Sequence, residues 1–260
     1  MSRGVSTRAE SPLSSRWVTF GVAAQNGVVA AFSAKEGFTG DETFLHKTFG
    51  QVHELTVSEE LLCSDLGQRF LVDETGIKPY PVGRQALSAV EAFREIIINN
   101  QVDPESIQEV SIWAPRQFVA RIDYPAWPEH RMDTVRSVQY QIALAAFDPA
   151  TLFNVPRDRL KKDDRMRALM GKIRVEPSKE LETFYPKVWP ARVEVRADGN
   201  TFTCEILHPK GDPENRFSWD EIIAKFQWVA APALDEKTSG AVIKLLPELD
   251  AQSSITPLLS

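Results

Sequence analysis

Two basic side chains, Lys78 and Arg84, occupy the positions of the chain that are best suited to bind an anion. Lys78 lies in a segment from which Pro79 and Pro81 exclude helix, and Arg84 follows where a helix begins. The start of a helix offers free backbone N–H groups and a positive dipole, so a carboxylate is favoured there. Arginine can hold a carboxylate with two hydrogen bonds, whereas lysine acts as a compact charge. The alternative is that both are ordinary solvated charges.

The sequence carries none of the common self-sufficient catalytic motifs. It lacks a glycine-rich phosphate loop, a Gly-x-Ser-x-Gly nucleophile turn and a His-Glu-x-x-His metal motif. His46 and His53 are seven residues apart and could share one helix face, but no third metal ligand accompanies them. The alternative for these two histidines is a solvated position on the surface. The two remaining histidines are His130 and His208.

Composition and charge indicate a globular protein without a nucleic-acid or membrane partner. Of the 260 residues, 43% are hydrophobic and 25% are charged, and the formal charge of −6 predicts no basic face. The longest weakly polar stretch, residues 27–34, is less than half of the roughly 20 residues that cross a bilayer. Cys63 and Cys204 are too few for a disulfide framework, so a reducing compartment, the cytoplasm, is expected.

The segment that carries Lys78 and Arg84 is predicted to connect a strand at residues 70–74 with an amphipathic helix at residues 84–99. Further elements are predicted along the chain: a strand at 107–114, helices around 137–147 and 158–172, a hairpin at 191–207 that turns at Asp198 and Gly199, a capped helix from Ser218, and short helices near 236–246 and from Pro247 onward. The middle of the chain therefore mixes strands and helices.

The first part of the chain is predicted to be helical. Residues 21–37 form a helix made largely of Gly, Ala and Ser that stops at Gly37, and a second helix begins at Thr39 or Asp41 and runs to Gly50. Small residues lie on nearly every face of the first helix. Such a helix has few side chains for a core of its own, so other helices are expected to approach its backbone closely.

These patterns divide the chain into four parts and predict an α+β fold class. Residues 1–16 form a disordered N-terminus, for which an Arg- and Ser-rich mitochondrial transit segment is the alternative. Residues 17–66 and 211–260 form two segments of a partial all-helical domain, one towards each end of the chain. Residues 67–210 form an α+β domain inserted between them.

Four segments, in order and spacing, resemble the MmgE/PrpD family. Gly-Ile-Lys-Pro-Tyr-Pro-x-x-Arg at 76–84 is similar to the family's Lys-Pro-Tyr-Pro-x-Cys-Arg segment. The small-residue helix with its Gly-Phe-Thr-Gly exit at 20–40, the Ser-x-x-Tyr-x-x-Ala helix at 137–143, and the Lys-Gly-Asp-Pro loop with its following Lys-Phe helix at 208–226 match as well. The family contains 2-methylcitrate dehydratases, cis-aconitate decarboxylases and fungal alkylcitrate dehydratases.

The resemblance implies an all-helical domain interrupted by an α+β lid domain, a homodimer, and no metal or organic cofactor. A heteromer is expected instead if another chain supplies the missing half. The implied chemistry is the elimination of water or carbon dioxide from a citrate-like polycarboxylate. Lys78 would be catalytic, binding or polarising one carboxylate, and Arg84 would anchor another. Arg16 stands where decarboxylase-type members carry a substrate-binding lysine, and it would help to close the pocket.

Departures from the family pattern leave a second hypothesis open. Only the C-terminal half of the family is matched, so the half with the catalytic histidines is missing, and Leu87 and Gly83 replace a family histidine and cysteine. The general base is then absent unless His130 or Tyr140 supplies it. The alternative to a lyase is a truncated, non-catalytic member or a partner subunit that needs another chain. A separate chain could also supply the missing half of an active enzyme. Both that split enzyme and the non-catalytic alternative predict exposed apolar surface around residues 21–34.

Overall fold

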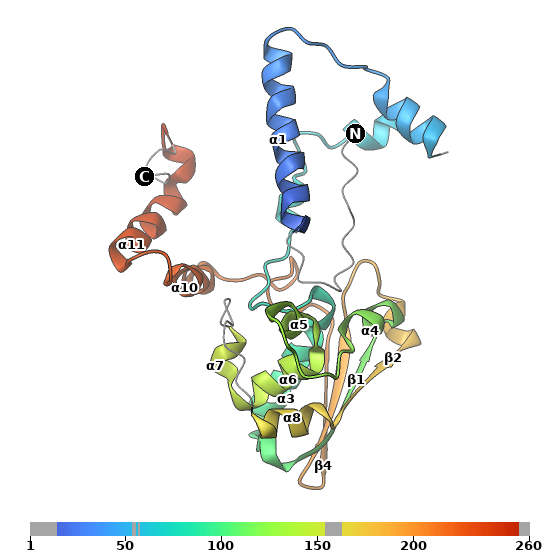
Figure 1. The fold of residues 1–260 in the computed structure, drawn as a ribbon, viewed down its shortest axis with the longest axis vertical. Coiled ribbons are helices and arrows are strands. Elements are labelled where there is room, and N and C mark those ends of the chain that lie inside the picture. Colours follow the sequence, from blue (N-terminus) through green and yellow to red (C-terminus); the bar gives the residue numbers. More distant parts are fainter. Residues whose placement is uncertain (1–14, 54–55, 57, 154–162, 255–260) are drawn as a thin grey trace. The chain divides into compact units, whose positions relative to one another are not determined.

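The computed structural model describes residues 15–53, 56, 58–153 and 163–254. Contacts divide the chain into two compact units, Met1–Leu71 and Val72–Ser260, which are described separately below (Figure 1). Most of the predicted disordered N-terminus and the first part of the predicted helix at 158–172 lie outside the described residues. The fold class is confirmed as α+β, whereas the domain boundaries and the lid arrangement stay predictions.

The larger unit is built on one mixed sheet with the strand order β2-β1-β3-β4. The central strand β1 (Ile107–Ala114) runs parallel to β2 (Ile173–Pro177) and antiparallel to β3 (Ala191–Ala197). β4 (Asn200–Ile206) completes the sheet as the antiparallel partner of β3. The strand predicted at 107–114 is therefore confirmed residue for residue.

The predicted hairpin is also confirmed, and its turn has the expected chemistry. Asp198 and Gly199 have φ angles of 51° and 76°, the left-handed conformation that a tight primed turn requires at both central positions. Asp and Gly tolerate this conformation better than most residues. The alternating strands on either side then place Val193 and Val195 in the core.

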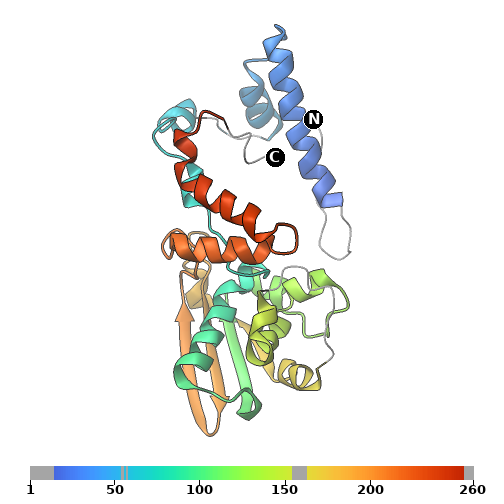
Figure 2. The ribbon, with the colours of Figure 1, turned by 90° about the vertical axis from the view of Figure 1, so that its left-hand side faces the viewer.

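Two helices cover one face of the sheet (Figures 1 and 2). α3 (Leu87–Asn100) follows a single 3-10 turn at Arg84–Ala86 and packs on β3 and β4. α6 (Val138–Phe147) begins at the cap residue Ser137 and packs against α3 and α8 (Asp164–Met170). The predicted helices at 84–99 and 137–147 are thus confirmed. Fully buried side chains from both helices and the sheet form the core: Phe93, Val90, Ile142, Leu144, Ile112 and Val193.

The remaining helices of this unit that precede the C-terminal segment are short. They are the 3-10 helix Pro104–Ser106, α4 (Arg116–Ile122), α5 (Arg131–Arg136), α7 (Pro149–Leu152) and α9 (Lys179–Glu182). α10 (Trp219–Ala230) opens with the predicted capping box, in which the side chains of Ser218 and Glu221 each accept a backbone N–H. α11 (Glu236–Leu245) and a 3-10 helix at Leu246–Ala251 follow, as expected.

The strand predicted at residues 70–74 is wrong. Leu71–Glu74 forms a 3-10 helix in which Val72 accepts a hydrogen bond from the backbone N–H of Thr75. Phe70, Leu71 and Val72 are exposed, and the four-stranded sheet does not pair with this segment. Apolar residues indicate a strand only when a neighbouring strand satisfies the backbone, and this segment satisfies it locally.

The smaller unit contains α1 (Ser15–Lys35), a π-helical segment (His46–Val52) and α2 (Glu59–Cys63). α1 ends as predicted just before Gly37, whose φ of 89° suits a helix stop. The second helix starts later than predicted. The carboxylate of Asp41 accepts hydrogen bonds from the backbone N–H and the hydroxyl of Thr43, which holds a turn there instead of a helix start.

The small-residue helix α1 is exposed, as expected both for a truncated member and for an enzyme whose other half is a separate chain. Val18, Val28, Val29 and Phe32 each expose more than half of their surface, between 55% and 65%. A Cβ atom added at Gly21 or Gly27 would meet no described atom within 4 Å. No described helix combines the length and the apolarity needed to cross a membrane.

Candidate functional site

The segment of Lys78 is fastened to the loop that follows β4. The backbone N–H of Ile77 donates a hydrogen bond of 2.8 Å to the carbonyl oxygen of Gly211. Gly211 has a φ of 92°, and a Cβ atom there would lie 1.8 Å from the carbonyl oxygen of Ile77. Only glycine permits this approach. Segments that are far apart in sequence therefore meet at the start of α3.

Arg84 holds a carboxylate at this junction, and the carboxylate belongs to the protein. Its Nη2 donates to both oxygens of Asp212, at 2.5 Å to Oδ1 and 2.7 Å to Oδ2. The side chain of Asp212 is 8% exposed and that of Arg84 is 26% exposed. The guanidinium also lies over the ring of Trp189, 5.3 Å from its centroid. The anion-binding chemistry predicted for Arg84 is thus present, with an internal partner.

One nitrogen of Arg84 is not used by this pair. Nη1 is buried and has no hydrogen-bond partner within the described part of the chain. A buried donor without a partner is costly, since it has given up its hydration without replacement. Nη1 is therefore the atom of Arg84 that a further acceptor would satisfy. Whether Arg84 binds a substrate stays a prediction.

Lys225 contacts the segment of Lys78 and adds a second basic side chain to this junction. Lys78 is exposed, and its Nζ donates to the carbonyl oxygen of Val82 at 2.9 Å. Lys225, on α10, donates from its Nζ to the backbone carbonyl of Lys78 at 2.6 Å. Burial, and secondarily the positive charge of Lys78, lowers the pKa of Lys225. The site is therefore cationic on the side of α10.

The loop is anchored a second time through Glu91 and Lys210. The backbone N–H of Lys210 donates to Oε2 of Glu91, in α3, at 2.7 Å, and burial raises the pKa of Glu91. The ammonium of Lys210 pairs with Glu221 at 2.8 Å. Glu221 belongs to the capping box of α10, so this contact also ties the loop to that helix. The cationic pair is thus held by α3, the loop and α10 together.

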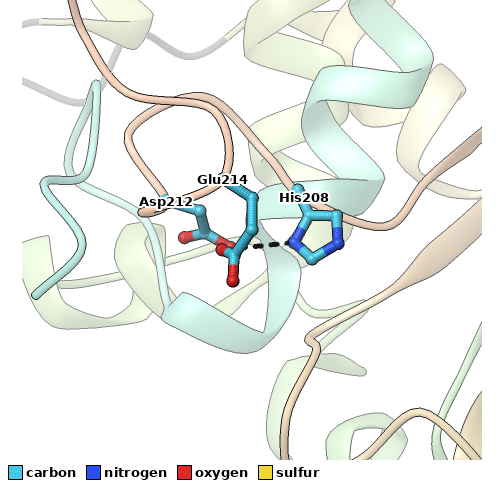
Figure 3. Close-up of side chains that lie close together, drawn as sticks. All are labelled: His208, Asp212 and Glu214. Carbon is cyan, nitrogen blue, oxygen red and sulfur yellow. Dashed lines mark ion pairs between the residues drawn. The ribbon is translucent and has the colours of Figure 1, made fainter. Parts of the chain in front are cut away.

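Three potential metal ligands meet on the same loop (Figure 3). One ligand atom from each of His208, Asp212 and Glu214 lies within 4.8 Å of the other two. His208 Nδ1 is 3.4 Å from Glu214 Oε2, and this ion pair is partly exposed. The sequence assigned no ligand role to His208, and the family resemblance implies no metal.

The other predicted site residues occupy different places. Arg16 lies in α1, in the smaller unit, and its side chain is outside the described set. His130 is exposed at the start of α5. Tyr140 is buried on α6, with its ring edge-on to Trp127 at 5.5 Å between centroids. The roles proposed for these three residues stay predictions.

Sequence reasoning did not assign roles to Asp212, Lys225 or Trp189. Asp212 stands 128 residues from Arg84 and Lys225 stands 147 residues from Lys78, so local spacing cannot pair them. Two sequence signals could have pointed to Asp212 and Lys225. They are the Gly-Asp-Pro and Lys-Phe sequences, which lie in the segment 208–226 that resembles the family. No comparable signal marks Trp189.

Comparison with known proteins supports the resemblance. Residues 80–249 match the family model described as the MmgE/PrpD C-terminal domain, which is more than half of the 260 residues. The matched range includes Arg84, Asp212 and Lys225. No curated protein matches the chain.

Proposed function

The chain belongs to the MmgE/PrpD family, and from this premise we propose that it binds a citrate-like polycarboxylate and serves as a lyase that removes water or carbon dioxide from it. The observation that carries this proposal is the convergence of Lys78 and Lys225 at one junction. The positive charge of Lys78 disfavours the charged form of Lys225, and a ligand with several carboxylates offsets that effect.

In this proposal each residue of the junction has a separate role. Lys78 binds or polarises one carboxylate, and Lys225 binds a second. Arg84 holds the loop in place through Asp212 and offers its remaining donor, Nη1, towards the ligand. Elimination next to a carboxylate builds negative charge on the substrate, and fixed cations stabilise that charge.

The test is calorimetric titration of the full chain with 2-methylcitrate and, separately, with cis-aconitate. We expect saturable binding that Lys78→Gln and Lys225→Gln each weaken by about tenfold, the loss of one well-placed charge contact. Lys187→Gln is the matched control, because Lys187 is exposed in a loop beyond α9. Circular dichroism of every variant confirms that the fold is retained.

A second readout separates direct binding by Lys225 from a change in the fold. A bound carboxylate raises the lowered pKa of Lys225, so binding takes up protons at alkaline pH. Titrations in buffers of different ionisation enthalpy measure this uptake, which should vanish in Lys225→Gln. Absence of saturable binding, or an equal loss in Lys187→Gln, would contradict the proposed function.

We also propose that the chain works as a homodimer or heteromer in the cytoplasm. The exposed apolar side chains of α1 support association. Both cysteines are free, and neither Cys63 nor Cys204 needs an oxidising compartment.

A further inference from the structure

We propose that His208, Asp212 and Glu214 bind one zinc ion. This site goes beyond the proposed lyase function and uses side chains that the function does not use, except that Asp212 also holds Arg84. Their ligand atoms all lie within 4.8 Å of one another, and His208 Nδ1 is already 3.4 Å from Glu214 Oε2. Zinc bonds of about 2.0–2.2 Å in a tetrahedral site need donors about 3.4 Å apart.

The donor set favours zinc over the common alkaline-earth ions. An imidazole nitrogen suits zinc, whereas magnesium and calcium prefer sites made only of oxygen. The carboxylates of Asp212 and Glu214 outnumber the single guanidinium of Arg84, so these three side chains together carry a net negative charge. The ammonium of Lys210 is paired with Glu221 instead. A divalent cation is therefore favoured between the two acids.

The loop holds these donors in place. Asn215 donates from its side chain to the carbonyl oxygen of His208 at 3.0 Å, and its backbone carbonyl accepts from Gly211 at 2.8 Å. Asp212 is fixed by Arg84, yet each of its oxygens retains a lone pair for a metal. Ligating carboxylates in metal sites are themselves usually hydrogen-bonded in this way. Glu214 is exposed, and its Oε2 already lies at the donor spacing of 3.4 Å from Nδ1 of His208.

Zinc at this position would cross-link residues 208, 212 and 214 and so restrict the motion of the loop that carries Asp212. The three ligands lie within seven residues of one another and leave a fourth position for water. Asp212 also binds Arg84 at the start of α3. The ion would therefore stabilise the contact between the loop and α3 without binding Lys78 or Lys225. The family resemblance implies no metal, and the site departs from that expectation.

The experiment is calorimetric titration of the full chain with zinc chloride after removal of metals by a chelator and dialysis. We expect one saturable ion, weakened at least about tenfold in His208→Ala and in Glu214→Gln. Both side chains are at least partly exposed, so the fold should survive the changes. Zinc should raise the melting temperature of the unaltered chain and not of these variants, because an ion that binds only the folded state stabilises it.

Matched controls identify the ligands. His53→Ala and Glu176→Gln remove exposed groups elsewhere and should leave zinc binding unchanged, and magnesium should bind at least about tenfold more weakly. Lys78→Gln should also leave it unchanged, which separates this site from the polycarboxylate site. No saturable zinc binding, binding that survives His208→Ala and Glu214→Gln, or binding abolished by Cys63→Ser would overturn the proposal.

Discussion

At the scale of single residues, the position of Arg84 was predictable and its partner was not. A basic side chain at the start of a helix, after two prolines, predicts a bound carboxylate, and one is bound there. The chain itself supplies it from Asp212, 128 residues away. The neighbouring residues in the sequence predict which kind of group a side chain can bind. Which group it binds is determined by the fold, because that group can be distant in the sequence. Lys225 was unassigned for the same reason.

The first prediction concerns the Arg84–Asp212 pair. Asp212→Asn removes the charge from a nearly buried group and leaves the guanidinium without its counter-ion. We expect the free energy of unfolding to fall by about 1–3 kcal/mol, measured by urea denaturation. Glu109→Gln is the control, because its pair with Arg196 is exposed and should cost less than about 1 kcal/mol. Equal losses of unfolding free energy in the two variants would show that the buried pair stabilises the fold no more than the exposed pair.

The second prediction concerns the pKa of Lys225, which burial and Lys78 lower. The folded protein then binds fewer protons than the unfolded chain between the lowered pKa and the ordinary value of 10.5. The contribution of Lys225 to stability therefore rises with pH through that window. Lys78→Gln removes the repelling charge, so the pKa of Lys225 should rise towards 10.5. NMR of the dimethylated lysines measures it, and an unchanged value would mean that burial acts alone.

At the scale of elements, the helices and strands whose ends carry a local sequence signal were predicted best. The hairpin has its Asp-Gly turn, and α10 has its capping box. The edge strand β2 was not predicted, because only Ile173 of its five residues is buried and no alternation marks it. Residues 70–74 were apolar enough for a strand but have no neighbouring strand to pair with. Pairing of strands is a property of the sheet and not of one segment.

The third prediction compares two glycines that share a left-handed conformation and differ in their surroundings. A Cβ atom at Gly199 would meet nothing described within 4 Å, whereas one at Gly211 would collide with the carbonyl of Ile77. Gly199→Ala should therefore cost only the backbone strain, about 1–2 kcal/mol. Gly211→Ala should cost well over twice as much, because the loop must also leave the Lys78 segment. Urea denaturation of both variants measures the difference in the free energy of unfolding. Similar losses would mean that the loop can move away from Ile77 at little cost.

At the scale of the whole molecule, the helical, mixed and helical order of the chain was predicted, while the distribution of the core was not. The main core cluster draws its buried side chains from the stretch between Tyr80 and Ala197. The larger unit, Val72–Ser260, therefore has a core of its own. Helix α1, which precedes this unit, contains many small residues, and its composition indicates that it needs close neighbours without identifying them. That is why association, and not packing within the chain, is the property to test for α1.

The last prediction is that α1 mediates association of the full chain. Val28 and Phe32 are one helical turn apart and are 56% and 65% exposed, so they form a continuous apolar strip. The double change Val28→Ser and Phe32→Ser removes that strip, and Ser is tolerated in a helix that already contains Ser33. Sedimentation equilibrium should show the unaltered chain self-associating and the double variant shifted towards monomer. The paired control, Lys35→Ser on the same helix, should associate normally because it leaves the apolar strip intact. A monomeric unaltered chain that gains mass only when mixed with a second protein would instead make α1 a heteromeric interface.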